Sequence, residues 1–279
     1  MFLLCCSILG SAMISVVMRL SQGKVKANTA MLSVNYLTCM VCAMCFTGVN
    51  QLFPAEPGIG RTLWMGGLNG GVYLGSLILI QYNVRRNGVV LQSVFSKLGD
   101  MLVPLAISIL FFGERPGALQ ILGAILAIGA ILAMNLDKNK QASVSMVALL
   151  LLFFWDGFSG AMSKIYEEVG TSALSSQFLL YTFGSAFLLS IVLVIVRKEK
   201  PGKWELLFGA LVGIPNYFSS RFLLMALDSV PAVVAYPLRS VSIIVVVTLT
   251  GVFVFREKLR KRQWWAIAAV LAAVALLSI

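Results

Sequence analysis

The chain has 279 residues, of which 59% are hydrophobic and 12% charged, and its mean hydropathy is +0.92. Soluble domains have roughly 45–50% apolar and about 25% charged residues, so this composition excludes a soluble globular protein. The net charge of +11 lies mostly in short loops between apolar segments, where membrane topology explains it. We therefore expect a lipid bilayer as the surroundings and no nucleic-acid partner.

Apolar segments of the length that crosses a membrane recur along the whole chain. About 20 apolar helical residues cross a hydrocarbon core of about 30 Å, and we predict an all-α polytopic membrane protein with ten transmembrane helices. The loops between them are short, so no soluble domain is expected between spans. The predicted spans are residues 2–20, 30–50, 62–83, 88–112, 117–135, 145–165, 173–196, 204–226, 231–255 and 262–279.

Three of the five cysteines form the string CMVCAMC, from Cys39 to Cys45, inside the second predicted span. A closed structural zinc site needs about four nitrogen or sulfur ligands, and the chain has no histidine. We interpret these cysteines as small residues at a helix contact, and we expect no metal and no other cofactor.

The chain repeats itself at a shift of 143 residues, without a gap from the second predicted span to the fifth. The first span needs a shift of four more residues, which places Gly10 on Gly157. The repeat predicts two five-helix units, residues 1–137 and 138–279. Because five is odd, the second unit is inverted in the membrane, as in many secondary transporters. Pairs related by 143 residues include Ala30 and Ala173, Gly66 and Gly209, Gly70 and Gly213, and Glu114 and Glu257.

The end of each unit resembles the end of an EamA-type repeat in the drug/metabolite transporter superfamily. Both FFGERPGALQILGAILAIGAILAMN and FVFREKLRKRQWWAIAAVLAAVALL contain an apolar helix, a Glu after Gly or a basic residue, a short linker and a Gln-bearing helix rich in small residues. The resemblance covers essentially the whole chain, as two tandem EamA-like units. It implies a ten-helix transporter, and members of the superfamily carry amino acids, drugs, nucleotide sugars or other metabolites.

Loop charges predict the orientation of the chain. Sixteen Lys and Arg residues lie beside the linkers that follow odd-numbered spans, against three on the other side: Arg61, Arg115 and Lys164. The positive-inside rule makes the basic side cytoplasmic and places both termini outside. Members of the family with ten helices usually have both termini inside, so the charges predict the opposite arrangement.

Five ionisable residues lie deep inside predicted spans. A charge at the bilayer centre costs at least ~2.5–3.5 kcal/mol on insertion scales, so each is expected to face a partner or a watery cavity. For the same reason each is a functional candidate. The five are Lys97, Asp100, Asp156, Arg221 and Arg239.

Lys97 and Asp100 are one turn apart on one helix face and can pair with each other. The shift of 143 places Ser96 on Arg239, so the fourth and ninth spans carry a base at nearly equivalent positions. Arg239 has no acid three or four residues further on, so its anion comes from a substrate phosphate or carboxylate, or from Asp100 or Asp156. Since arginine suits bidentate oxyanion recognition, we predict that Lys97 and Arg239 contact an anionic substrate. Superfamily members that carry nucleotide sugars or phosphorylated sugars resemble this pattern.

Other polar residues on these spans are candidates for lining a substrate cavity. Gln92 and Ser93 come shortly before Lys97 in the fourth span, and Tyr236 comes shortly before Arg239 in the ninth. Asn216 and Tyr217 lie deep in the eighth span.

Asp156 is expected to pair with Arg221 or Arg239, or to carry a coupling proton. Arg221 lies about two turns before the end of its span, so it is expected to snorkel to the interface or to form an ion pair.

These features predict a secondary active transporter that works by alternating access around a central cavity, with a small polar substrate that bears a carboxylate or phosphate. An exporter of amino acids or of cationic or neutral drugs, and a flippase for a lipid-linked phosphate or sugar, remain alternatives. The deep acids are scattered and histidine is absent, so we expect no enzyme. A coupling proton or a counter-substrate is the expected partner besides the substrate, and short loops favour a bacterial cytoplasmic membrane.

Overall fold

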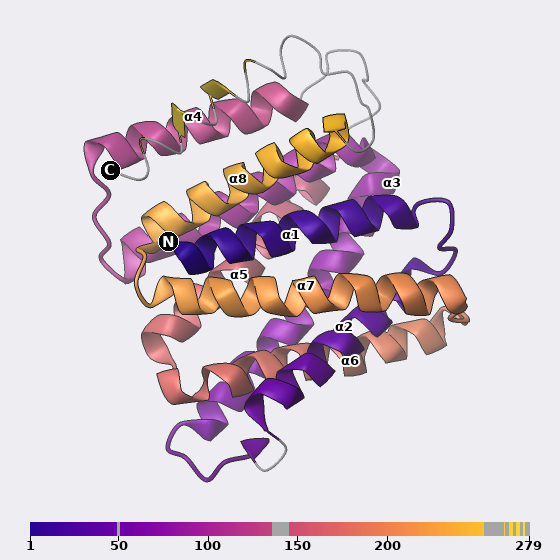
Figure 1. The fold of residues 1–279 in the computed structure, drawn as a ribbon. Coiled ribbons are helices and arrows are strands. Elements are labelled where there is room, and N and C mark those ends of the chain that lie inside the picture. Colours follow the sequence, from indigo (N-terminus) through magenta and orange to yellow (C-terminus); the bar gives the residue numbers. More distant parts are fainter. Residues whose placement is uncertain are drawn as a thin grey trace. The chain divides into compact units, whose positions relative to one another are not determined.

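The computed structural model describes residues 1–48, 51–135 and 145–253, with isolated positions between 265 and 276. Within these ranges the regular elements are helices (Figure 1), and seven segments are long and apolar enough to cross a membrane. The α-helices are α1 (Phe2–Ser21), α2 (Asn28–Thr47), α3 (Ile59–Phe111), α4 (Ala118–Asn135), α5 (Met146–Val169), α6 (Ser175–Val196), α7 (Lys203–Leu227) and α8 (Ala232–Phe253); a short 3₁₀ helix, Ser172–Leu174, precedes α6.

The prediction of an all-helical membrane protein is confirmed, but the count of ten helices is not. Each of the eight helices coincides with predicted apolar spans, and α3 takes the place of two of them, 62–83 and 88–112. The last predicted span, 262–279, lies mostly outside the described residues.

Helix α3 continues through the predicted turn because nothing in that segment ends a helix. The chain has no proline between Pro57 and Pro104, and a single glycine such as Gly88 costs a helix only about 1 kcal/mol. At 1.5 Å per residue, the 53 residues of α3 correspond to about 80 Å of helix. This exceeds twice the thickness of a hydrocarbon core, so α3 carries the residues of both predicted spans.

The chain divides into two compact units. The first unit comprises Met1–Leu74 and Ile165–Ala226, and the second comprises Gly75–Lys164 and Leu227–Ile279. Each unit therefore combines residues from both halves of the sequence. The two sequence repeats, 1–137 and 138–279, stay a prediction, and helices that the repeat relates, such as α2 and α6, share one unit.

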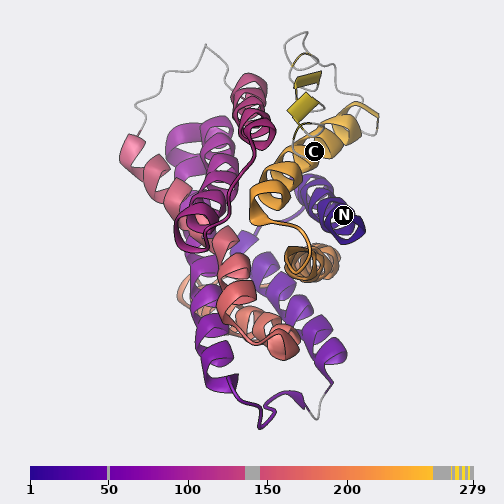
Figure 2. The same ribbon diagram turned by 90° about the vertical axis from the view of Figure 1, so that its left-hand side faces the viewer.

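The first unit contains α1, α2, the start of α3, α6 and α7. Helices α2 and α6 pack against each other, and α1 lies beside α7 in both views (Figures 1 and 2). The Ser7 hydroxyl donates to the Ser219 carbonyl at 2.9 Å across the α1–α7 contact. Between α2 and α7, the buried Cys39 thiol donates to the Gly213 carbonyl at 3.2 Å, as expected for a small residue at a helix contact.

Two glycine pairs bring α3 against α6 and α7 against α2 in the same way. A Cβ atom on Gly70 would lie 2.5 Å from the carbonyl oxygen of Thr182, and one on Gly213 would lie 2.8 Å from that of Asn35. One turn earlier, Gly66 faces the carbonyl of Phe178 and Gly209 faces that of Met31, at 3.0 and 2.6 Å. Glycines four residues apart let helix backbones approach closely. The contacts are reciprocal between the two halves of the chain.

These contacts correct the register of the repeat. Gly70 and Gly213 differ by 143 residues, but their partners Thr182 and Asn35 differ by 182 − 35 = 147. Helices α2 and α6 therefore follow the larger shift that the sequence already requires for the first span. The pairing of Ala30 with Ala173 is wrong by one helical turn. The coincidence of small residues misplaced the gap, which lies after the second span.

Gly70→Ala is expected to destabilise the protein, because its Cβ would meet the backbone of α6. Gly67→Ala is the matched control: its Cβ would have no neighbour within 4 Å, and Ala favours a helix over Gly by roughly 0.5–1 kcal/mol. Thermal unfolding of both purified variants in detergent measures the difference. Equal melting temperatures would contradict the close approach of α3 and α6.

In the second unit, Glu114 holds the N-terminus of α8. Its two carboxylate oxygens accept hydrogen bonds from the backbone N–H groups of Ala232 and Val233, at 3.0 and 2.9 Å. The first N–H groups of a helix have no partner within the helix and carry partial positive charge, so a carboxylate stabilises them. The Lys164 ammonium lies 3.2 Å from the same carboxylate, with 5% of its side chain exposed.

Burial raises the pKa of Glu114, but the hydrogen bonds from Val233 and Ala232 and the Lys164 ammonium favour the ionised form more strongly. The pKa of Glu114 is therefore lowered below its ordinary value of 4.5. A carboxyl group with a lowered pKa stabilises the fold above its ordinary pKa, and this contribution is lost as the pH falls through the lowered pKa.

Glu114→Gln is expected to lower the melting temperature at pH 7, because it leaves Lys164 buried without its carboxylate. The gap to wild type is expected to narrow below about pH 4.5, as wild-type Glu114 takes up a proton. The double variant Glu114→Gln/Lys164→Met removes both charges and should lose less stability than Glu114→Gln alone. A gap that stays constant from pH 7 to pH 3 would show that the carboxylate charge makes no contribution.

Candidate functional site

In the second unit, two basic side chains from different helices converge on one carboxylate. Lys97 and Asp100 lie one turn apart on α3, with Lys97 Nζ 4.0 Å from Asp100 Oδ2. Arg239, on α8, places Nη1 3.6 Å from the same oxygen. The expected proximity of Lys97 and Arg239 is thus observed, and Asp100 is the anion that Arg239 needed.

The three side chains differ in how far water reaches them. Lys97 has 38% of its side chain exposed, against 19% for Asp100 and 14% for Arg239. A half-exposed pair at 4.0 Å is worth little, whereas a pair removed from water is screened less. Lys97 is therefore the base that a dissolved anion can reach with the smaller loss of existing contacts.

Glycines on α3 and α5 bring a second acid close to this cluster. A Cβ atom on Gly157 would lie 2.5 Å from the carbonyl oxygen of Gly99, and one on Gly160 would lie 2.5 Å from Asp100 Oδ1. Asp156 on α5 accepts a hydrogen bond from the hydroxyl of Ser96 on α3. Asp100 and Lys97 both act electrostatically on Asp156.

Asp156 therefore has a different partner from those expected, since the structure pairs Arg239 with Asp100 and shows Ser96 at Asp156. Sequence reasoning missed Ser96, although it lies one residue before Lys97. With all four ionised, the two acids and two bases of the cluster balance. The charges of this region are thus compensated locally, which lowers the cost of holding them inside a span.

Tyr236 and Gln92 lie in the same unit but are more enclosed than expected for residues that line a cavity. The Tyr236 hydroxyl donates to the Gly160 carbonyl at 2.9 Å, and 1% of the residue is exposed. Gln92 is 7% exposed. Ser93 lies on α3, but its side chain is outside the described part of the structure.

The remaining predicted residues belong to the first unit. The Asn216 amide donates to Asn35 Oδ1 at 3.1 Å. Arg221 donates through Nη1 to the Tyr217 hydroxyl at 2.8 Å, and its guanidinium lies 4.5 Å from the centroid of the Phe46 ring. Neither the expected ion pair nor a snorkelling position describes this arrangement. The role of all these residues in substrate binding stays a prediction.

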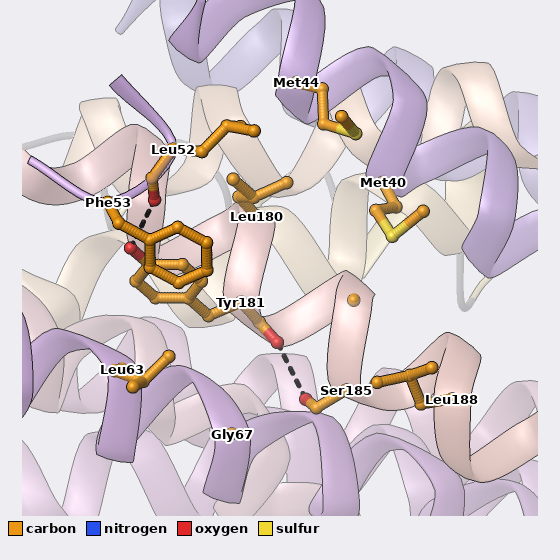
Figure 3. Close-up of a pocket in the computed structure, with 11 residues that line it drawn as sticks. Met40, Met44, Leu52, Phe53, Leu63, Gly67, Leu180, Tyr181, Ser185 and Leu188 are labelled. Carbon is orange, nitrogen blue, oxygen red and sulfur yellow. Dashed lines mark hydrogen bonds between the residues drawn. The ribbon is translucent and has the colours of Figure 1, made fainter. Parts of the chain in front are cut away.

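The first unit also contains an apolar pocket of about 320 Å³ that sequence reasoning missed (Figure 3). Met40 and Met44, one turn apart on α2, form part of its wall, and their spacing was the available signal. The Tyr181 hydroxyl is already used, since it donates to the Leu52 carbonyl at 2.6 Å, and Phe53 stacks on the Tyr181 ring at 5.7 Å. The lining residues carry no charge, so this pocket does not suit the anionic part of a substrate.

Comparison with known proteins gives relatives of two kinds. An uncharacterized protein of Haemophilus influenzae is 22% identical over 209 residues, which cover 73% of this chain and 72% of that one. The probable 4-amino-4-deoxy-L-arabinose-phosphoundecaprenol flippase subunit ArnE of Proteus mirabilis is 36% identical over 61 residues, which cover 22% of this chain and 53% of the relative. The two chains align over only about half of ArnE, so its activity is not transferred.

A solved crystal structure with 15% sequence identity superposes with a TM-score of 0.77, covering 99% of this chain and 94% of the other. The fold is thus shared along the whole chain. Residues 143–279, nearly the whole of the second predicted five-helix unit, match the EamA-like transporter family. Through this half, the chain belongs to the EamA-like transporter family of membrane proteins.

Proposed function

We propose that the protein is a secondary active transporter for a small polar metabolite that bears a carboxylate or a phosphate. The observation that carries this proposal is the convergence of Lys97 and Arg239 on Asp100, at 4.0 and 3.6 Å. The family match supports transport as the activity. The substrate class comes from the charges of the cluster alone.

In the proposed cycle, the anionic group of the substrate competes with Asp100 for its two bases. Its oxyanion takes the place of the Asp100 carboxylate beside Lys97, the more exposed base, and then beside Arg239. Asp100 then loses its partners, and a proton on Asp100 or Asp156 restores the charge balance. When the substrate leaves, Asp100 pairs with the bases again and releases the proton. Exchange with a second anion achieves the same balance without a proton.

We further propose that access alternates between two inverted five-helix repeats. The reciprocal glycine contacts, Gly70 on α6 and Gly213 on α2, support this symmetry because they use equivalent positions of the two halves. The bacterial sources of both relatives support a bacterial cytoplasmic membrane. The orientation with both termini outside stays a prediction.

A lipid flippase is the second candidate, and the partial similarity to the ArnE flippase subunit favours it. A phosphate on a lipid would meet the same two bases. Uptake of a water-soluble anion into proteoliposomes, compared with movement of a fluorescent isoprenoid phosphate between leaflets, separates the two candidates. Activity on the lipid alone would replace the soluble metabolite with a lipid-linked substrate.

The variants of the cluster are expected to change anion binding in opposite directions. Lys97→Ala or Arg239→Gln should weaken anion binding about ten- to a hundredfold, because a hydrogen bond to a charged group is worth ~1.5–3 kcal/mol. Asp100→Asn should strengthen binding, because it removes the competing carboxylate, yet it should stop transport. Thermal shift with a panel of carboxylates and organic phosphates, followed by uptake of the best ligand, measures both effects.

Arg115→Gln is the matched control, since Arg115 is an exposed base in a loop of the same unit. It should leave binding and uptake unchanged. Stabilisation of the wild type by cationic or neutral compounds alone would contradict the anionic substrate. Weaker anion binding in Asp100→Asn would show that Asp100 supports the bound ligand and does not compete with it.

A further inference from the structure

Arg221 differs from the other bases that lie deep in predicted spans. Lys97 and Arg239 both pair with Asp100. Among the described residues, Arg221 has no carboxylate partner; its contacts are the Tyr217 hydroxyl and the face of Phe46. A charge inside a span that lacks a counter-ion is costly unless a ligand or water completes it. Arg221 therefore has a different use from that of the charge-balanced cluster in the second unit.

The donors of Arg221 exceed the acceptors that the protein provides. A guanidinium has five N–H donors in a fixed fork, and one of them is used by Tyr217 at 2.8 Å. The Tyr217 oxygen accepts this bond, so its own O–H remains a donor. The fork and the phenol thus present hydrogen-bond donors side by side and no negative charge. This is the chemistry that carboxylate and phosphate oxygens require.

Aromatic packing fixes the orientation of these donors. The Phe46 ring lies 4.5 Å from the guanidinium carbon and stacks on Tyr217 with centroids 5.8 Å apart. Phe218 meets the edge of Phe46 at 5.5 Å. Tyr217 is fully buried, so its ring position is set by packing. A guanidinium stacked on a ring loses little further freedom when it binds an oxyanion, which favours binding.

The position of Arg221 along α7 places it away from the basic end of the first unit. Glu205, in the first turn of α7, accepts from the N–H groups of Lys26 and Ala27 at the start of α2. Phe46 lies near the end of α2 and contacts Arg221 near the end of α7. The two helices therefore run parallel, and Arg221 lies near the end opposite to Lys26. By the predicted orientation this end faces the outside.

We propose that Arg221, Tyr217 and Phe46 form an oxyanion-binding site near this end of the first unit. Its ligand is a phosphate or carboxylate group, which either a dissolved anion or the headgroup of an anionic lipid can supply. The site is separate in its residues from the Asp100 cluster. It does not depend on the transport cycle proposed above, and binding alone tests it.

The test has two arms, one for each source of the oxyanion. In the first, the full-length protein in a neutral detergent is titrated with sodium phosphate against sodium chloride at equal ionic strength, and its melting temperature is measured. In the second, the protein is placed in nanodiscs of phosphatidylcholine alone or with a quarter of phosphatidylglycerol, without phosphate. We expect at least one arm to stabilise the wild type, and Arg221→Gln to weaken that effect at least tenfold.

Arg61→Gln is the matched control, because Arg61 is an exposed arginine of the same unit that donates to a backbone carbonyl. It should keep the full effect. A response to phosphate in detergent assigns a dissolved anion, and a response only to phosphatidylglycerol assigns a lipid headgroup. An unresponsive wild type in both arms, or an unchanged response in Arg221→Gln, would overturn the proposal.

Tyr217→Phe keeps the proposal testable if Arg221→Gln does not fold. It removes the hydroxyl and retains the ring that stacks on Phe46. We expect its melting temperature in chloride to stay close to that of wild type, while the response to the oxyanion weakens several-fold. A full response in Tyr217→Phe would exclude the phenol from the site and contradict the proposed geometry.

Discussion

A charge inside a membrane span needs a counter-charge, and in the second unit Asp100 meets that need for both Lys97 and Arg239. This constraint explains several neighbouring features. Gly160 leaves the space that the Asp100 carboxylate occupies, and Gly157 allows α5 to approach α3 closely enough for Asp156 to reach Ser96. Glu114 fixes the start of α8, two turns before Arg239. The positions of α3, α5 and α8 within the unit are thus adapted to bring four charges into one balanced cluster.

Much of this arrangement is predictable from residue spacing. The i, i+3 spacing of Lys97 and Asp100 places them on one face of a helix, and the internal repeat places Arg239 near the equivalent position. Burial cost then demands that these charges meet. The partner of Asp156 was not predictable, because an acid in a span can be satisfied by a hydroxyl as well as by a base. Spacing gives the face of a helix, but it does not give the rotation of one helix against another.

The errors in the fold have a similar origin. Hydropathy located the apolar segments, but no proline or strong turn marks the boundary between the two spans that α3 unites. The repeat register slipped by one turn at α2 and α6, because Ala and Ser coincide easily in a composition rich in small residues. Only the contacts of Gly70 and Gly213 fix the register. Arg221 shows the same limit, since the aromatic side of Phe46 comes from a different helix.

The account depends on Asp100 being energetically coupled to Arg239, and a double-mutant cycle measures this coupling most directly. The free energy of unfolding is compared for the wild type, Asp100→Asn, Arg239→Gln and the double variant. The account predicts that the double variant loses less stability than the sum of the two single losses, by about 1 kcal/mol or more, because each single variant leaves one charge alone. Losses that add to within about 0.3–0.5 kcal/mol would show that the two residues do not interact.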